Sequence, residues 1–212
     1  MHVYIDIETL PADWSEAQIV SHATAHVPGN YTKPETVQKW IEEHADELHR
    51  RTALDGLHAR LLCVGLAIGD DDPVEVIYSA TADVHELCDE LYDRLERIPT
   101  PVFCGHNVAG FDLPMLRRFA WLSGHKRLAR LLPGRPRSQF VIDTLDLWKG
   151  TDTHAKHVKL SQLAEFFNCG TKGEGLDGSQ VYDAWLRGEH DRIGRYCAQD
   201  VELVRAIVEA MV

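Results

Sequence analysis

The sequence predicts an α/β protein with one mixed five-stranded sheet and helices on both faces. Three observations lead to this prediction. Segments with the apolar pattern of strands alternate with segments that have the period of amphipathic helices. Two early strands are joined by a short turn, which favours antiparallel pairing. The later strands are joined through helices, which favours parallel crossovers.

The first predicted strand contains "VYIDIE" (3–8), where successive side chains alternate between two faces. One face is apolar, and the other carries the carboxylates of Asp6 and Glu8 side by side. Two unit charges about 6 Å apart repel by roughly 3 kcal/mol at an effective dielectric constant of about 20. The folded protein is therefore expected to compensate this repulsion.

The other elements follow in order along the chain. A helix with proline in its first turn is predicted at 32–51, either as a lid over a site or as simple packing. Two strands, "ARLLCVGLAIG" and "VEVIYSA", flank a "DDDP" turn, and an amphipathic helix follows at 82–98. Further strands are predicted at 101–107 and within 138–147, and helices at about 113–122, 159–168, 179–187 and 190–211.

Composition restricts the class of protein. The chain has 212 residues, 44% of them hydrophobic, which suits one globular domain with a core. Its apolar runs are too short to span a bilayer and no signal peptide is visible, so no membrane partner is expected. Five scattered cysteines without a CxxC pair predict reduced thiols and a cytoplasmic location.

The charge distribution is uneven. A net charge of −11 argues against a broad basic surface for duplex DNA or membranes. The segment from Arg117 to Arg137 nevertheless contains seven basic residues and no acidic ones. This segment is either a solvated helix face with a loop or a strip that contacts phosphates.

Two further acidic positions stand out. Asp112 lies where the loop in "CGHNVAGFD" meets a predicted helix, so on its own it is readily explained as a helix cap. Tyr196 and Asp200 are four residues apart in the last helix and share one helical face. Asp200 lies beside an apolar stripe, where a carboxylate is costly unless it is paired or bound to a metal.

Together these positions place four carboxylates on three elements that the sheet can bring to one edge. Four clustered carboxylates would repel one another or take up protons in the absence of cations. Two divalent ions about 3.5–4 Å apart would neutralise them and serve phosphoryl transfer. Ligation by carboxylate oxygens alone favours Mg²⁺ or Mn²⁺.

The motifs "DIET", "HNVAGFD" and "YCAQD", in this order, resemble those of the DEDD (DnaQ-like) 3′–5′ exonuclease superfamily. The stretch "LDGSQVYDAWLRGEHDRIGRYCAQDVELV" is most similar to stand-alone relatives of the proofreading exonuclease domain of family-B DNA polymerases. This resemblance implies an RNase H-like fold. It also implies a single 3′–5′ exonuclease domain over 1–212, with an inserted helical segment at about 20–58.

The resemblance also assigns roles to individual residues. It implies that two metal ions are held by Asp6, Glu8, Asp112 and Asp200. Tyr196 matches the tyrosine of the DEDDy branch, which orients the attacking water. The sister branch has a histidine at the position of Arg195, so the sequence does not fit that branch. A phenol with a pKa near 10 is a poor base at neutral pH, which favours a hydrogen-bonding role for Tyr196.

Four further residues are candidates for substrate binding. By resemblance, Thr9 and Leu10 contact the terminal nucleotide, although both are equally explained as an ordinary strand exit. Asn107 is expected to contact the substrate strand. Phe111 either stacks on a base or packs in the core.

The sequence therefore predicts a metal-dependent exonuclease that releases 5′-mononucleotides from the 3′ end of single-stranded nucleic acid, with DNA favoured over RNA. A polymerase or a replication or repair protein is a candidate partner. Two alternatives stay open: an exoribonuclease acting on RNA ends, and a catalytically silent RNase H-like module that binds nucleic acid or a partner.

Overall fold

The computed structural model describes residues 1–134, 139–152, 154–171 and 175–212. Within these residues the chain folds into two compact units. The first unit combines Met1–Glu8 with Leu61–Val212, and the second contains Thr9–Arg60.

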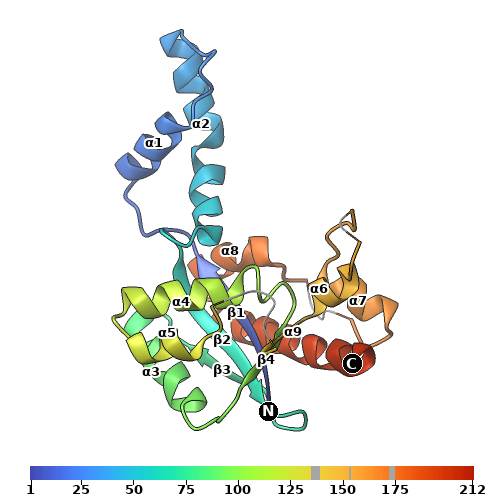
Figure 1. Ribbon diagram of the computed structural model, residues 1–212. Helices are drawn as coiled ribbons and strands as arrows, with labels where there is room; N and C mark the ends of the chain where they lie inside the picture. The colour runs from blue at the N-terminus through green and yellow to red at the C-terminus, as the bar shows by residue number, and fades with distance from the viewer. Residues whose placement is uncertain (135–138, 153, 172–174) are drawn as a thin grey trace. The chain divides into compact units, whose positions relative to one another are not determined.

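A five-stranded sheet forms the centre of the first unit (Figure 1). In spatial order its strands are β3 (Glu75–Tyr78), β2 (Arg60–Ile68), β1 (His2–Leu10), β4 (Val102–Gly105) and β5 (Val141–Asp143). β2 and β3 pair antiparallel, whereas β4 pairs parallel with both β1 and β5. The predicted mixed sheet is thus confirmed, with the early hairpin at one edge and the helix-linked strands at the other.

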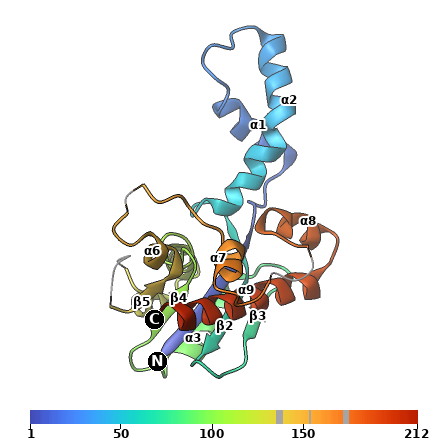
Figure 2. The ribbon, with the colours of Figure 1, turned by 90° about the vertical axis from the view of Figure 1, so that its right-hand side faces the viewer.

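Helices cover both faces of this sheet. Alternate side chains of a strand point to opposite faces, and on β1 both Tyr4 and Ile5 are buried. Tyr4 packs in a cluster with apolar residues of α7 (Leu160–Phe166) and α9 (His190–Met211). The other face is covered by α3 (Val84–Leu95), α4 (Asp112–Leu122) and α5 (Lys126–Leu131) (Figures 1 and 2).

The last helix approaches the sheet closely at Gly65 of β2. A Cβ atom added to Gly65 would lie 2.9 Å from Cys197 Sγ and 3.0 Å from Val201 Cγ2, closer than packed atoms tolerate. Glycine therefore lets α9 pack directly on the strands. Figure 2 shows α9 in front of the sheet, with α8 (Val181–Leu186) preceding it.

Two short helices, α5 and α6, are not among the helices predicted from the sequence. α6 (Thr144–Lys149) follows β5 directly, because the Asp143 side chain accepts hydrogen bonds from the backbone N–H groups of Leu145 and Asp146. α5 begins where the His125 ring accepts a hydrogen bond from the Leu128 N–H at 3.1 Å. Both helices are six residues long, too short for a hydrophobic period to reveal them.

The second unit consists mainly of two contacting helices, α1 (Glu16–Ala25) and α2 (Pro34–Arg51). The predicted helix at 32–51 is therefore confirmed, with proline at its first position. The ring of Trp14 lies 4.8 Å from His22 and 5.0 Å from His58, measured between ring centroids. Burial, together with the neighbouring His26 and His58, lowers the pKa of His22.

In the part of the chain that the structure describes, no helix combines the length and apolar character needed to cross a bilayer.

Candidate active site

Three carboxylates converge between β1 and α9. Tyr4 faces α9, so the alternation along β1 turns Asp6 and Glu8 towards the same helix. Asp200 projects from α9, and ligand atoms of these three acids all lie within 4.8 Å of one another. Glu8 and Asp200 are only 8% and 5% exposed, so their charges are largely removed from water.

Asp112 lies beside this cluster. It is the first residue of α4, and its Oδ1 accepts a hydrogen bond from the backbone N–H of Ile7 at 3.1 Å. Burial raises the pKa of the Asp112 carboxyl to about 7, and the charges of Asp143 and Asp200 act in the same direction. The carboxylate is thus directed to the strand that carries Asp6 and Glu8.

Tyr196 lies one helical turn before Asp200. Its hydroxyl donates a hydrogen bond to the Asp200 carboxylate. Burial raises the pKa of Tyr196, and the carboxylates of Glu8 and Asp200 raise it further. The phenol therefore keeps its proton at neutral pH and can act as a hydrogen-bonding group.

The loop between β4 and α4 is fixed by a carboxylate from β5. Asp143 accepts hydrogen bonds from the backbone N–H groups of Asn107 and Ala109, both at 2.9 Å. Asn107 adopts a left-handed conformation with φ of 59°, and Asn107 Oδ1 would lie 2.5 Å from a Cβ atom added to Gly110. Asp143 thus caps α6 and in addition orders the loop that leads to Asp112.

The four predicted substrate-binding residues lie in different surroundings. Asn107 and Phe111 are both partly buried at the two ends of this loop. Thr9 and Leu10 belong to the second unit, where the Thr9 hydroxyl donates to the Ala53 carbonyl oxygen at 2.7 Å and Leu10 is fully buried. Their contacts with a nucleotide stay predictions.

A pocket of about 520 Å³ adjoins the acidic cluster. Asp6, Tyr196 and Asp200 line one part of it, and His106, His157 and Lys159 line another. The His106 ring is held in place because its Nδ1 hydrogen-bonds with the Thr144 hydroxyl and its Nε2 with the Val158 carbonyl oxygen, both at 2.9 Å. The volume and mixed polarity suit a small charged ligand.

The basic part of this lining, which lies in the same pocket as Asp177, is absent from the residues predicted from the sequence. Its signal is the run "HAKHVKLS" (154–161), which places several basic residues immediately before α7. Without the fold, nothing connects this run with the acids of β1.

Cys197 contributes a further contact to the cluster that the sequence did not reveal. The Cys197 thiol donates weakly to Asp6, with Sγ 3.6 Å from Oδ2, and it also hydrogen-bonds with Cys63. Because Gly65 leaves room for this thiol, Cys197 contacts β2 as well as the metal-ligand candidate Asp6.

The donor set fits divalent cations. Asp6, Glu8 and Asp200 offer only carboxylate oxygens, which are the ligands that Mg²⁺ and Mn²⁺ prefer. Burial, and after it the charges of Asp143 and Asp200, raises the pKa of Asp112, and a nearby cation would favour its charged form.

The basic segment 117–137 is divided by the structure. Arg117 and Arg118 lie on α4, and Lys126, Arg127 and Arg130 lie on α5. The predicted contributions of Arg135 and Arg137 fall outside the described residues.

Comparisons with known proteins add to this geometry. Residues 51–212 match the RNase H superfamily. The RNase H-like fold that the sequence motifs imply is thereby confirmed. An alignment over 152 residues, which covers 66% of this chain, shows 25% identity to a DNA polymerase of Archaeoglobus fulgidus. That alignment covers 18% of the polymerase, so the chain spans less than a fifth of the length of this relative.

Proposed function

The chain belongs to the RNase H superfamily, and we propose that it is a metal-dependent 3′–5′ exonuclease of the DEDDy type. Its proposed substrate is the 3′ end of single-stranded nucleic acid, from which it releases 5′-mononucleotides. The observation that carries the proposal is the convergence of Asp6, Glu8 and Asp200, with ligand atoms within 4.8 Å of one another. Asp112 and Tyr196 adjoin the same cluster.

The four carboxylates would hold two Mg²⁺ or Mn²⁺ ions. Such ions supply charge neutralisation for the scissile phosphate and a lowered pKa for the attacking water. The protein's own contribution is to hold four acids in place before the substrate arrives, so that little reorganisation is needed during the reaction. The Ile7 amide and the Asp143-ordered loop support Asp112 in this role.

Tyr196 orients the attacking water rather than deprotonating it. Its raised pKa keeps the phenol protonated at neutral pH, so it cannot take the proton of the water, and its hydroxyl is anchored to the Asp200 carboxylate. The adjoining pocket would hold the terminal nucleotide, with Lys159 available to a phosphate oxygen. Thr9, Leu10, Asn107 and Phe111 are proposed to contact the last nucleotides of the strand.

DNA is the proposed substrate because the similar segment of the archaeal relative belongs to a DNA polymerase. A polymerase or another replication or repair protein is a proposed partner for the same reason. We also propose that residues 1–212 form one exonuclease domain, with an inserted helical segment at about 20–58.

The test uses single-stranded DNA and RNA oligonucleotides labelled at the 3′ or the 5′ end, incubated with Mg²⁺, Mn²⁺ or EDTA. We expect stepwise shortening from the 3′ end of DNA, with mononucleotides as products and no reaction in EDTA. Asp6→Ala and Asp200→Ala should abolish shortening, whereas Glu209→Gln, an exposed change on α9, should not. Activity that survives Asp6→Ala, or requires no metal, contradicts the proposal.

The same assay separates the alternatives. Preferential shortening of RNA would identify an exoribonuclease. Binding of oligonucleotides without shortening under any metal condition would identify a silent binding module.

A further inference from the structure

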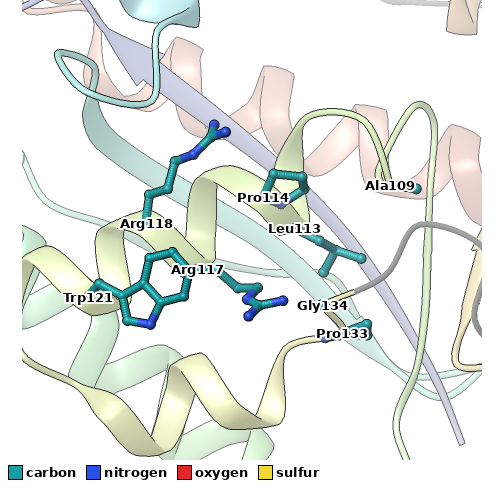
Figure 3. Close-up of a pocket in the computed structure, with 8 residues that line it drawn as sticks. All are labelled: Ala109, Leu113, Pro114, Arg117, Arg118, Trp121, Pro133 and Gly134. Atoms are coloured by element: carbon teal, nitrogen blue, oxygen red, sulfur yellow. The ribbon is translucent and has the colours of Figure 1, made fainter.

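A second pocket, of about 310 Å³, lies on the outer side of α4 (Figure 3). Leu113, Pro114, Arg117 and Trp121 line it from the helix, and Pro133 and Gly134 close it from the segment after α5. Among the described residues that line it, Arg117 and Arg118 carry charge and none is acidic. In a chain with a net charge of −11, this local positive charge favours an anionic ligand.

The Arg117 side chain is built into this pocket. Its guanidinium carbon lies 5.2 Å from the centroid of the Trp121 ring, and Figure 3 shows the guanidinium between that ring and Gly134. A Cβ atom added to Gly134 would lie 2.1 Å from one terminal nitrogen of Arg117. Glycine therefore allows the backbone to approach the guanidinium and hold it against the indole.

The Nε of Arg117 is buried, and it has no hydrogen-bond partner among the described residues. A buried donor without an acceptor is unfavourable, so a ligand that supplies an anionic oxygen gains from this arrangement.

Trp121 supplies the apolar part of the site. Trp121 is 59% exposed, so much of its surface is open to a ligand. An exposed aromatic ring next to arginines is the combination that single-stranded nucleic acids use, with a base on the ring and a phosphate on the guanidinium.

The pocket is connected to the acidic cluster through the chain. Ala109 lines the pocket and donates its backbone N–H to Asp143, and Leu113 directly follows Asp112. The loop that ends at Asp112 thus borders the acidic site as well as the second pocket.

We propose that the Arg117–Trp121 pocket binds one nucleotide of a single-stranded nucleic acid, upstream of the end held at the acidic cluster. The base stacks on Trp121, and the phosphate contacts Arg117 and Arg118. The inference rests on the proposed function for the direction of the strand, but the binding itself does not require hydrolysis.

The first experiment measures binding in EDTA by fluorescence anisotropy of a labelled oligo-dT 12-mer. Trp121→Ala should weaken binding about tenfold, as expected for the loss of one stacked base. Arg118→Gln should also weaken binding and should reduce its salt dependence. The matched controls are Leu122→Ala, 70% exposed on the same helix, and Arg97→Gln, exposed after α3.

The second experiment compares hydrolysis of the 12-mer with that of thymidine 5′-p-nitrophenyl phosphate, which carries a single nucleotide and so cannot occupy both sites. Trp121→Ala should raise KM for the 12-mer much more than for this single-nucleotide substrate. Equal effects of Trp121→Ala on KM for both substrates overturn the inference. It is also overturned if Trp121→Ala binds the 12-mer as tightly as Leu122→Ala does. If the unaltered protein binds the 12-mer in EDTA but hydrolyses neither substrate, the proposed function fails, and the binding comparison still decides the role of the pocket.

Discussion

The Asp112 carboxylate accepts a hydrogen bond from the backbone N–H of Ile7 at 3.1 Å, although 105 positions separate the two residues. Ile7 lies between Asp6 and Glu8, so this bond fixes a fourth acid beside the strand that carries the first two. Burial raises the pKa of the same carboxyl to about 7. Burial of the Asp112 carboxyl therefore lowers the free energy of unfolding of the metal-free protein, and this effect can be measured.

Asp112→Asn should stabilise the metal-free protein at neutral pH. The native Asp112 holds its proton up to about pH 7, whereas the unfolded chain releases it near the ordinary value of 3.8. Between these values the native state binds more protons than the unfolded state, so its stability falls as the pH rises. The full effect is about 4 kcal/mol at neutral pH, and the neutral amide removes it.

The measurement is urea unfolding in EDTA between pH 4.5 and 7.5. The free energy of unfolding of Asp112→Asn should exceed that of the unaltered protein increasingly as the pH rises. Asp93→Asn, an exposed change on α3, serves as the control. A difference that does not vary with pH would show that burial of Asp112 is not its source.

Tyr196→Phe should slow turnover while leaving cation binding intact. The change removes the hydroxyl that donates to Asp200 but keeps the buried ring. Loss of a positioned hydrogen-bonding group of this kind costs about 10²-fold in kcat. The check is kcat in saturating Mg²⁺ together with Mn²⁺ titration calorimetry, with the exposed Tyr31→Phe as control. Loss of Mn²⁺ affinity in Tyr196→Phe would contradict the water-orienting role.

Asp143→Ala should destabilise the protein and disorder the loop before α4. The substitution leaves the backbone N–H groups of Asn107 and Ala109 without their acceptor and removes the cap of α6. Bonds to a charged acceptor and a cap together account for about 3 kcal/mol. Urea unfolding gives this value, and amide hydrogen exchange should increase at 107–111. Asp146→Ala, exposed in the first turn of α6, should show neither change.

Acidification should weaken the second unit through His22. The lowered pKa of His22 means that below about pH 6.5 the unfolded chain takes up a proton before the native chain does. Stability is therefore lost as the pH falls through this range. His22→Asn should flatten the pH dependence of the thermal midpoint between pH 7.5 and 5.5, whereas His85→Asn, exposed on α3, should not. An NMR titration of the His22 ring checks the direction of the shift.

Much of the fold could be predicted because its elements carry strong local patterns. The alternation in 3–8 marks β1, and the apolar stripe of 190–211 gives α9 with the same limits as the structure. The spacing of Tyr196 and Asp200 on one helical face also holds, because four residues are about one turn.

The rest depends on contacts between distant residues. No local pattern indicates that Asp143 orders the loop at Asn107, or that Cys197 lies against Asp6. Lys159 and His157 were missed as lining residues because their relation to the acids exists only after folding. Periodicity shows which face a side chain occupies, but it does not show which segment will cover that face.

The acidic cluster has a consequence for studies of folding itself. Its members come from β1 and α9, and the adjoining Asp112 comes from α4. These elements are far apart along the chain, so no single segment can assemble the site. A collapsed intermediate that retains its helices but not its packing has no such arrangement of carboxylates. Cation-dependent stabilisation is accordingly a reporter of completed tertiary structure, and its appearance in a refolding experiment would mark the moment at which the last helix docks on the sheet.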